Sequence, residues 1–230
     1  MHRASLMFPI ALLVLAAAPS SFGGWTVITI HDLPEYLVAG ESTTLAFTIR
    51  QHGQELLPGR SPTVTLKDTD AGWFGGKQRF AARAAGRGVY EATITPEETG
   101  EVEITVDADF HGSRSTLLPM RVLAAGGGQA ALPVVERGRQ LFVAKGCATC
   151  HTKRDDPDIL ARNAVAVGPD LTGRELPVEW LAAKLADPAK DRVRTNEDVE
   201  MPNLGLDERE IAALVSYVNG RELQAVGSRE

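Results

Sequence analysis

The chain has 230 residues, of which 43% are hydrophobic and 23% are charged, and its formal net charge is −6. This length suits one or two domains of ordinary globular composition. The acidic balance argues against a general nucleic-acid binder, because phosphate binding requires a basic surface and the sequence contains no Lys/Arg cluster.

The first 23 residues predict a signal peptide. His2 and Arg3 form a short basic start, and residues 6–18 form an apolar stretch shorter than the roughly 20 residues that a membrane-spanning helix requires. Cleavage is plausible near Ala18 or Gly23, and the later position avoids a proline directly after the cut. We therefore expect a periplasmic or extracytoplasmic protein, with membrane association only if the segment is retained as a tether.

Residues 24–123 alternate with a period of two. Short runs rich in β-branched residues are separated by turn-forming segments such as Ala39-Gly40-Glu41-Ser42 and His52-Gly53. This spacing predicts an all-β, antiparallel sandwich of immunoglobulin-like type. The expected strands cover residues 26–30, 44–49, 63–66, 88–94, 101–106 and 117–123.

Two features of this region resemble the FixH-like and YtkA-like family of β-sandwich domains. One is the strand, Pro-x-x-x-Gly turn and strand of residues 88–107, and the other is the pair of segments at 38–41 and 50–53. The resemblance implies a setting beside respiratory oxidase assembly or copper-handling proteins.

The soft-metal candidates in this domain have no ligand-like spacing, so we interpret them as scattered residues, with a copper site as the alternative. They are His31, His52, His111 and Met120.

Residues 124–133 are rich in Ala and Gly and predict a flexible linker. We expect the two domains to stay near each other without being fixed. Beyond this linker, residues 134–220 form the second expected domain, and residues 221–230 form a C-terminal tail.

The run Cys147-Ala148-Thr149-Cys150-His151 predicts a covalent haem attachment site. Two thiols separated by two residues reach the two vinyl groups of one porphyrin, and the histidine that follows is placed beneath the iron. A redox disulfide and half of a zinc site are the alternatives. A zinc site needs two more ligands, whereas the chain has no other cysteine and no histidine after His151. We therefore expect one covalently attached haem c.

After Pro133 the hydrophobic period changes to that of helices. A glycine inside the first helix, Gly138, costs about 1 kcal/mol relative to alanine, so we expect another helix to cross closely there. The last helix supplies it, with Leu214 and Tyr217 expected to meet Gly138 and Phe142. The three helices are expected at 134–145, at 176–187 and from the Asp207 cap to Gly220.

The sixth ligand of the iron is predicted by elimination. Met201 is the only methionine after the linker, and His151 is the only histidine there. A His/Met pair is the arrangement of electron-carrying cytochromes.

Residues 134–220 resemble a class I cytochrome c domain, with an all-α fold. The resemblance implies that Pro169 offers its carbonyl to the second ring nitrogen of His151. Trp180 is expected at the haem, either packed over the porphyrin edge or bonded to a propionate. The matching pieces, in order, are Gly138-x-x-x-Phe142, Cys147-Ala148-Thr149-Cys150-His151, Gly168-Pro169-Asp170-Leu171, Met201-Pro202 and Leu214-x-x-Tyr217.

The chain departs from the shortest members of that family in two charged loops, at 152–167 and 189–200. These loops are interpreted as solvated charge or as a docking rim for a partner.

Together these features predict an exported carrier of single electrons, with the sandwich as a docking or accessory module and an oxidase, a reductase or another cytochrome as partner. No catalytic residues are expected, although the chain is a candidate subunit of a larger oxidoreductase. The alternatives are a copper-handling assembly protein with an accessory haem, and a haem sensor whose Met201 bond is labile.

Overall fold

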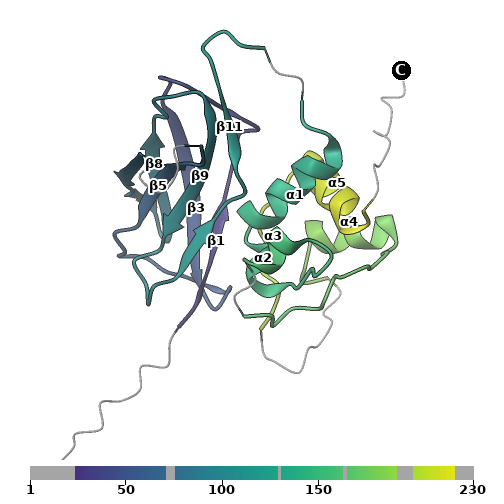
Figure 1. The fold of residues 1–230 in the computed structure, drawn as a ribbon. Coiled ribbons are helices and arrows are strands. Elements are labelled where there is room, and N and C mark those ends of the chain that lie inside the picture. The colour runs from purple at the N-terminus through teal and green to yellow at the C-terminus, as the bar shows by residue number, and fades with distance from the viewer. Residues whose placement is uncertain (1–23, 71–75, 129–130, 163–164, 191–198, 221–230) are drawn as a thin grey trace, which may run out of the picture.

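The computed structural model describes residues 24–70, 76–128, 131–162, 165–190 and 199–220. A β-sandwich comes first in the chain and an α-helical domain follows it (Figure 1). The predicted fold class, an immunoglobulin-like sandwich followed by an all-α domain, is confirmed. The predicted signal peptide and C-terminal tail lie outside the described residues.

The sandwich consists of two sheets. One sheet has the order β1 (Thr26–Ile30), β3 (Thr43–Gln51), β8 (Val89–Ile94) and β7 (Arg83–Gly86), with β4 (Glu55–Leu56) paired to β3. The other has the order β2 (Leu37–Val38), β11 (Met120–Leu123), β9 (Gly100–Asp107), β5 (Thr63–Asp68) and β6 (Lys77–Ala81), with β10 (Arg114–Thr116) paired to β9. Paired strands are antiparallel except β2 and β11, which are parallel.

Alternating side chains fill the space between the sheets. In β3 the alternate residues Leu45, Phe47 and Ile49 are buried in this space, and the facing sheet contributes Ile104 and Val106 of β9. This is the hydrophobic-in pattern that a period of two produces in a sheet with one buried face.

Some strands were not predicted. β6 and β7 contain no β-branched residue, so propensity gives them no signal. The last predicted strand was too long at its start, because Pro119 has no N–H to donate and the strand begins at Met120.

The helical domain contains five helices among its described residues: α1 (Val134–Ala144), α2 (Cys147–Cys150), α3 (Pro157–Leu160), α4 (Val178–Ala186) and α5 (Glu208–Val218). In the part of the chain that the structure describes, none of the helices has the length and apolar character needed to cross a membrane.

The crossing of α1 and α5 explains the glycine in α1. A Cβ added to Gly138 would lie 1.9 Å from the carbonyl oxygen of Ala213 and 2.7 Å from the Cβ of Tyr217. One turn further along α1, the rings of Phe142 and Tyr217 pack with their centroids 5.4 Å apart. The predicted close crossing is confirmed. So is the predicted N-terminal cap of α5, where Asp207 and the third helical residue form a capping box.

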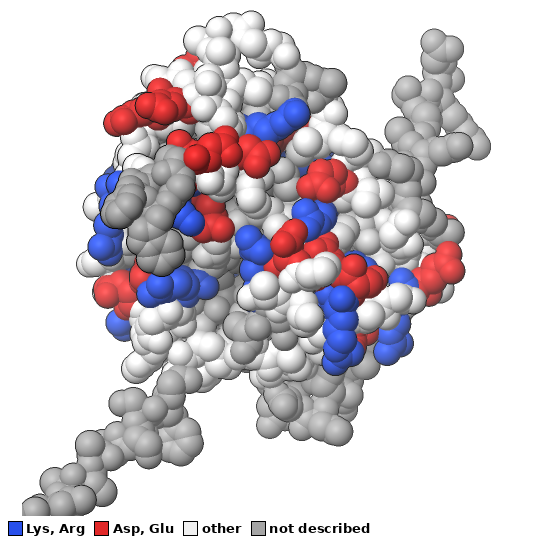
Figure 2. Space-filling view, in the orientation of Figure 1, with Lys and Arg blue, Asp and Glu red and all other residues white. Residues whose placement is uncertain are grey.

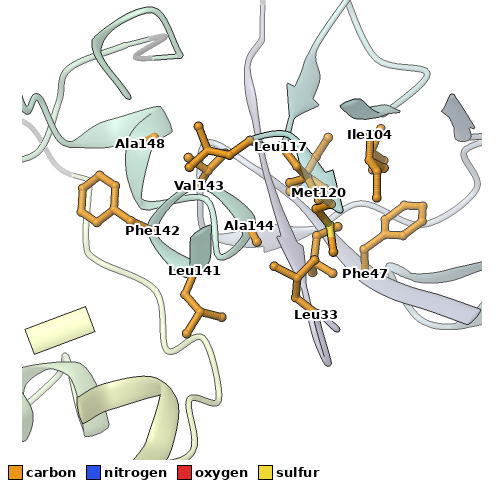
Figure 3. Packing of buried hydrophobic residues seen from close by; sticks show 14 of the residues in the cluster. Leu33, Phe47, Ile104, Leu117, Met120, Leu141, Phe142, Val143, Ala144 and Ala148 are labelled. Atoms are coloured by element: carbon orange, nitrogen blue, oxygen red, sulfur yellow. The ribbon is translucent and has the colours of Figure 1, made fainter. Parts of the chain in front are cut away.

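The expectation that the two domains are not fixed was wrong. Three cationic side chains of the helical domain donate to main-chain carbonyls of the sandwich: Arg137 to Leu33 at 2.5 Å, Lys145 to His31 at 2.5 Å, and Arg162 to Thr116 at 2.8 Å. These acceptors are backbone groups, so side-chain patterns do not reveal them. Figure 3 shows the same junction, where Val143 and Ala144 of α1 face the sandwich core and belong to the same hydrophobic cluster.

Candidate haem-binding site

A single helical turn presents the two cysteines and the histidine. Gly146 adopts a left-handed conformation (φ 83°) that ends α1 and allows α2 to begin at Cys147. After Cys150 the chain turns to an extended conformation at His151 (φ −101°, ψ 131°). Both thiols and the imidazole therefore come from one short segment.

The thiols have the properties of structural rather than reactive cysteines. Burial, with a smaller contribution from Cys150, raises the pKa of Cys147 to about 12, and burial raises the pKa of Cys150 to about 11. A reactive Cys-x-x-Cys pair needs the opposite shift, because the thiolate is the nucleophile. Among the described residues there is also no group of three or more His, Cys, Asp or Glu side chains that would hold a metal ion. The redox-disulfide and zinc alternatives therefore find no support.

The tautomer of His151 follows from its hydrogen bond. Its Nδ1 lies 3.0 Å from the carbonyl oxygen of Pro169. A carbonyl only accepts, so Nδ1 carries the proton and Nε2 keeps its lone pair for a metal. Burial lowers the pKa of His151, and the bond to Pro169 opposes this shift. The imidazole is thus held neutral with one nitrogen free.

Gly168 fixes the position of this imidazole. A Cβ on Gly168 would lie 2.7 Å from both Cε1 and Nδ1 of His151, which leaves no room for a side chain. Its N–H donates to the carbonyl of Cys150 at 2.9 Å. The sequence indicated Gly168 only as part of a motif, and its role as the support of the ring was missed.

The structure places the remaining predicted site residues less closely. Met201 is half-buried in the segment that precedes α5, where it packs against the hydrophobic cluster. Trp180 lies on α4 with 40% of its surface exposed. Among the described residues, neither Met201 nor Trp180 contacts His151 through a hydrogen bond or ring contact, so their roles toward a haem stay predictions.

The four soft-metal candidates of the sandwich have four different environments. His31 Nε2 is 2.6 Å from the Thr48 hydroxyl, and Met120 is buried in the core. The rings of His52 and His111 pack against aromatic rings, those of Trp25 and Phe110. None of these environments indicates copper.

The first charged loop pairs its charges within the domain. Lys153 is buried, 2.8 Å from Asp155, and lies over the ring of Tyr217. Asp156 accepts from Arg139 at 2.7 Å and from the Tyr217 hydroxyl at 2.9 Å. Charges of both signs therefore lie side by side over the helical domain (Figure 2). The interpretation of this loop as solvated charge was wrong for Lys153 and Asp156, because Tyr217 of helix α5 packs against them.

Residues 191–198 of the second charged loop lie outside the described residues.

A groove of about 360 Å³ runs between the sandwich and α2. Trp25 and residues 112–116, which include strand β10, line its sandwich side, and Ala148, Thr149 and Arg162 line its helical side. Ala148 and Thr149 are the two residues between the cysteines, so the groove opens beside the attachment turn.

The residues present fit a covalently bound haem. Two thiols on one turn and a neutral imidazole with a free Nε2 are the donor set that the group requires, and together they define a domain of the haem-attaching class. Residues 135–222 match the model of the cytochrome c family. The C-terminal part of the chain is therefore a cytochrome c domain, which implies one covalently attached haem c and a general role in electron transfer.

No curated protein matches the chain. Solved structures resemble its sandwich part: the Lin-41 filamin domain (14% identity, TM-score 0.33, 42% of this chain and 90% of that chain), a β-glucosidase from Listeria innocua in complex with glucose (17%, 0.31, 47% and 17%), and the Escherichia coli adhesin FdeC (19%, 0.31, 44% and 32%). These likenesses carry no functional inference, and the FixH-like resemblance stays a prediction.

Proposed function

We propose that the protein is an exported carrier of single electrons between respiratory redox proteins. The observation that carries this proposal is the hydrogen bond from His151 Nδ1 to the Pro169 carbonyl, which leaves Nε2 as the donor to iron. His151 and Met201 would together hold the iron and leave it no free position for a substrate, so the chemistry that the haem would supply is electron transfer.

The residues of the chain have distinct tasks in this proposal. Cys147 and Cys150 hold the porphyrin through thioether bonds, and Gly168 and Pro169 orient the imidazole. Met201 supplies the sixth ligand, a thioether that favours the reduced iron and raises the reduction potential. When bound, the haem supplies a one-electron redox couple, while the protein supplies burial and ligands rather than acid–base groups.

The sandwich serves as a docking or accessory module, and the groove beside α2 supports this part of the proposal. A partner that enters it touches the sandwich and the residues between the cysteines at once. An oxidase, a reductase or another cytochrome is the partner expected, in a periplasmic or other extracytoplasmic compartment. Membrane association requires that residues 1–23 are retained.

Visible spectra of the haem-loaded protein test the ligand set. The oxidised protein should show the weak far-red sulfur-to-iron band, and Met201→Ala should abolish it. Met120→Leu is the matched control, because Met120 is buried in the sandwich core and its replacement should leave the band unchanged. A high-spin spectrum of the unsubstituted protein would refute the six-coordinate assignment.

Carbon monoxide separates the carrier from the sensor. A carrier with a firm Met201 bond should bind carbon monoxide slowly or not at all at neutral pH. Rapid binding would instead identify the haem as a ligand sensor, with the sandwich as the domain that reports the bound state.

A further inference from the structure

Strand β1 is buried on both faces, although it is an outer strand of its sheet. All five of its residues are buried, whereas an edge strand of a sandwich ordinarily exposes one face. The cover on its outer face is the segment that leads into the haem attachment turn. The Thr29 hydroxyl donates to the carbonyl of Lys145 at 3.4 Å. Gly146 lies so close that a Cβ on it would be 2.5 Å from Val27 Cγ1 and 2.9 Å from the carbonyl oxygen of Ile28.

The Lys145 ammonium joins three segments of the chain. Its Nζ lies 2.6 Å from Glu210 Oε1 in α5 and donates to the carbonyl of His31 in the sandwich at 2.5 Å. The side chains of Lys145 and Glu210 are only 3% and 13% exposed. Glu210 also accepts from the N–H of Asp207, the residue that caps α5.

This arrangement couples the segments that carry the predicted axial ligands. Lys145 comes two residues before Cys147, and Asp207 follows the segment that contains Met201. Burying an ammonium without its partners lowers the stability of the fold, because the charge loses its hydration and forms no compensating hydrogen bond or ion pair. The position of β1 is therefore linked to the start of the attachment turn and to the start of α5.

We propose that the sandwich is a positioning element of the haem site, which acts through Lys145 and Gly146 to hold the His151 segment and the Met201 segment in a fixed relation. The inference rests on the proposed function, since it assumes that Met201 is the sixth ligand. It assigns to the sandwich a role beyond docking: without β1, the segment before Cys147 loses its support and the Met201 bond is weakened.

The first experiment uses the full, haem-loaded chain with Lys145→Met, which keeps an unbranched side chain one atom shorter and removes the charge. Exogenous imidazole competes with methionine for ferric iron, so its affinity reports the strength of the Met201 bond. We expect the affinity to rise about tenfold and the far-red band to weaken, because the buried partners of the ammonium are left unpaired.

Arg139→Met is the matched control. Arg139 pairs with Asp156 and Asp158, which both belong to the helical domain. Its replacement should lower the melting temperature without changing the imidazole affinity. Equal imidazole affinities in the two variants would overturn the inference. A far-red band that is already absent from the unsubstituted protein would instead overturn the proposed function, so the two failures are distinguishable.

The second experiment tests the contact with β1 directly and does not depend on Lys145. Gly146→Ala should raise the imidazole affinity. Adding Val27→Ala should lower the affinity part of the way back, because this change removes the atom closest to the added Cβ, Val27 Cγ1. Gly40→Ala controls for left-handed backbone strain, because Gly40 has a φ of 77° but no atom within 4 Å of an added Cβ. If Val27→Ala gives no restoration, the sandwich does not act through this contact.

Discussion

The sandwich and the helical domain are held together by different means. In the sandwich, large side chains such as Phe47 and Ile104 alternate along strands and fill the space between the sheets. In the helical domain, close contacts between segments occur at three glycines, which have no side chain. Added Cβ atoms would overlap neighbours at 1.9 Å for Gly138, 2.5 Å for Gly146 and 2.7 Å for Gly168. The stability of the sandwich therefore depends on large core side chains such as Phe47, whereas the helical domain also depends on the absence of a side chain at Gly138, Gly146 and Gly168.

The largest expected effect is truncation in the sandwich core. Phe47→Ala should lower the free energy of unfolding by about 4 kcal/mol, because Phe47 is fully buried and its removal leaves a cavity. Denaturant unfolding would measure this change. Leu56→Ala is the control, since Leu56 is 40% exposed and its truncation should change stability by less than about 0.5 kcal/mol. Similar losses for both variants would contradict the account of the core.

The opposite substitution should be nearly as damaging in the helical domain. Gly138→Ala should destabilise it by about 3 kcal/mol, because the added methyl overlaps the Ala213 carbonyl despite the better helix propensity of alanine. The thermal unfolding of the haem-loaded protein would show this loss. Gly128→Ala, where an added Cβ meets no atom within 4 Å, should leave the transition unchanged. A neutral Gly138→Ala would show that α1 and α5 do not cross as described.

The sequence predicted the alternating core of the sandwich better than it predicted the glycine contacts of the helical domain. The period of two revealed the sandwich, and Gly138 inside a helical pattern revealed the close crossing. The roles of Gly146 and Gly168 were missed, because a glycine in a loop has many possible reasons and only the fold identifies the neighbour. The junction between the domains was missed because its acceptors, such as the His31 carbonyl, are backbone groups common to all residues.

A smaller effect is expected from the hydrogen bond that links α5 to the charged loop. Tyr217→Phe removes the hydroxyl that donates to Asp156 at 2.9 Å. The loss should be about 1 kcal/mol, because Asp156 keeps its bonds to Arg139. Equilibrium unfolding in denaturant would measure it. A loss of more than about 3 kcal/mol would mean that the ring of Tyr217, rather than its hydroxyl, had been disturbed.

The smallest effect is expected from pH. Burial raises the pKa of Asp156, but the hydrogen bonds from Arg139 and Tyr217 outweigh it and hold the pKa below its ordinary value of 3.8. The folded carboxyl thus binds a proton less readily than the unfolded one, so its stabilisation is complete above the unfolded pKa and is lost as pH falls through the folded pKa. Unfolding measured from neutral pH downward should lose stability below about pH 4. Asp156→Asn should reduce this acid-dependent loss. An unchanged acid dependence would contradict the assignment.

The most direct test of the central claim, a haem held between His151 and Met201, is the proton NMR spectrum of the reduced, haem-loaded protein. A methionine methyl bound to the iron lies over the porphyrin face, so its three-proton resonance should appear far upfield of the ordinary methyl region. We predict that this resonance is present in the unsubstituted protein and in Met120→Leu, and absent from Met201→Ala. Its persistence in Met201→Ala, or its absence from the unsubstituted protein, would contradict the account.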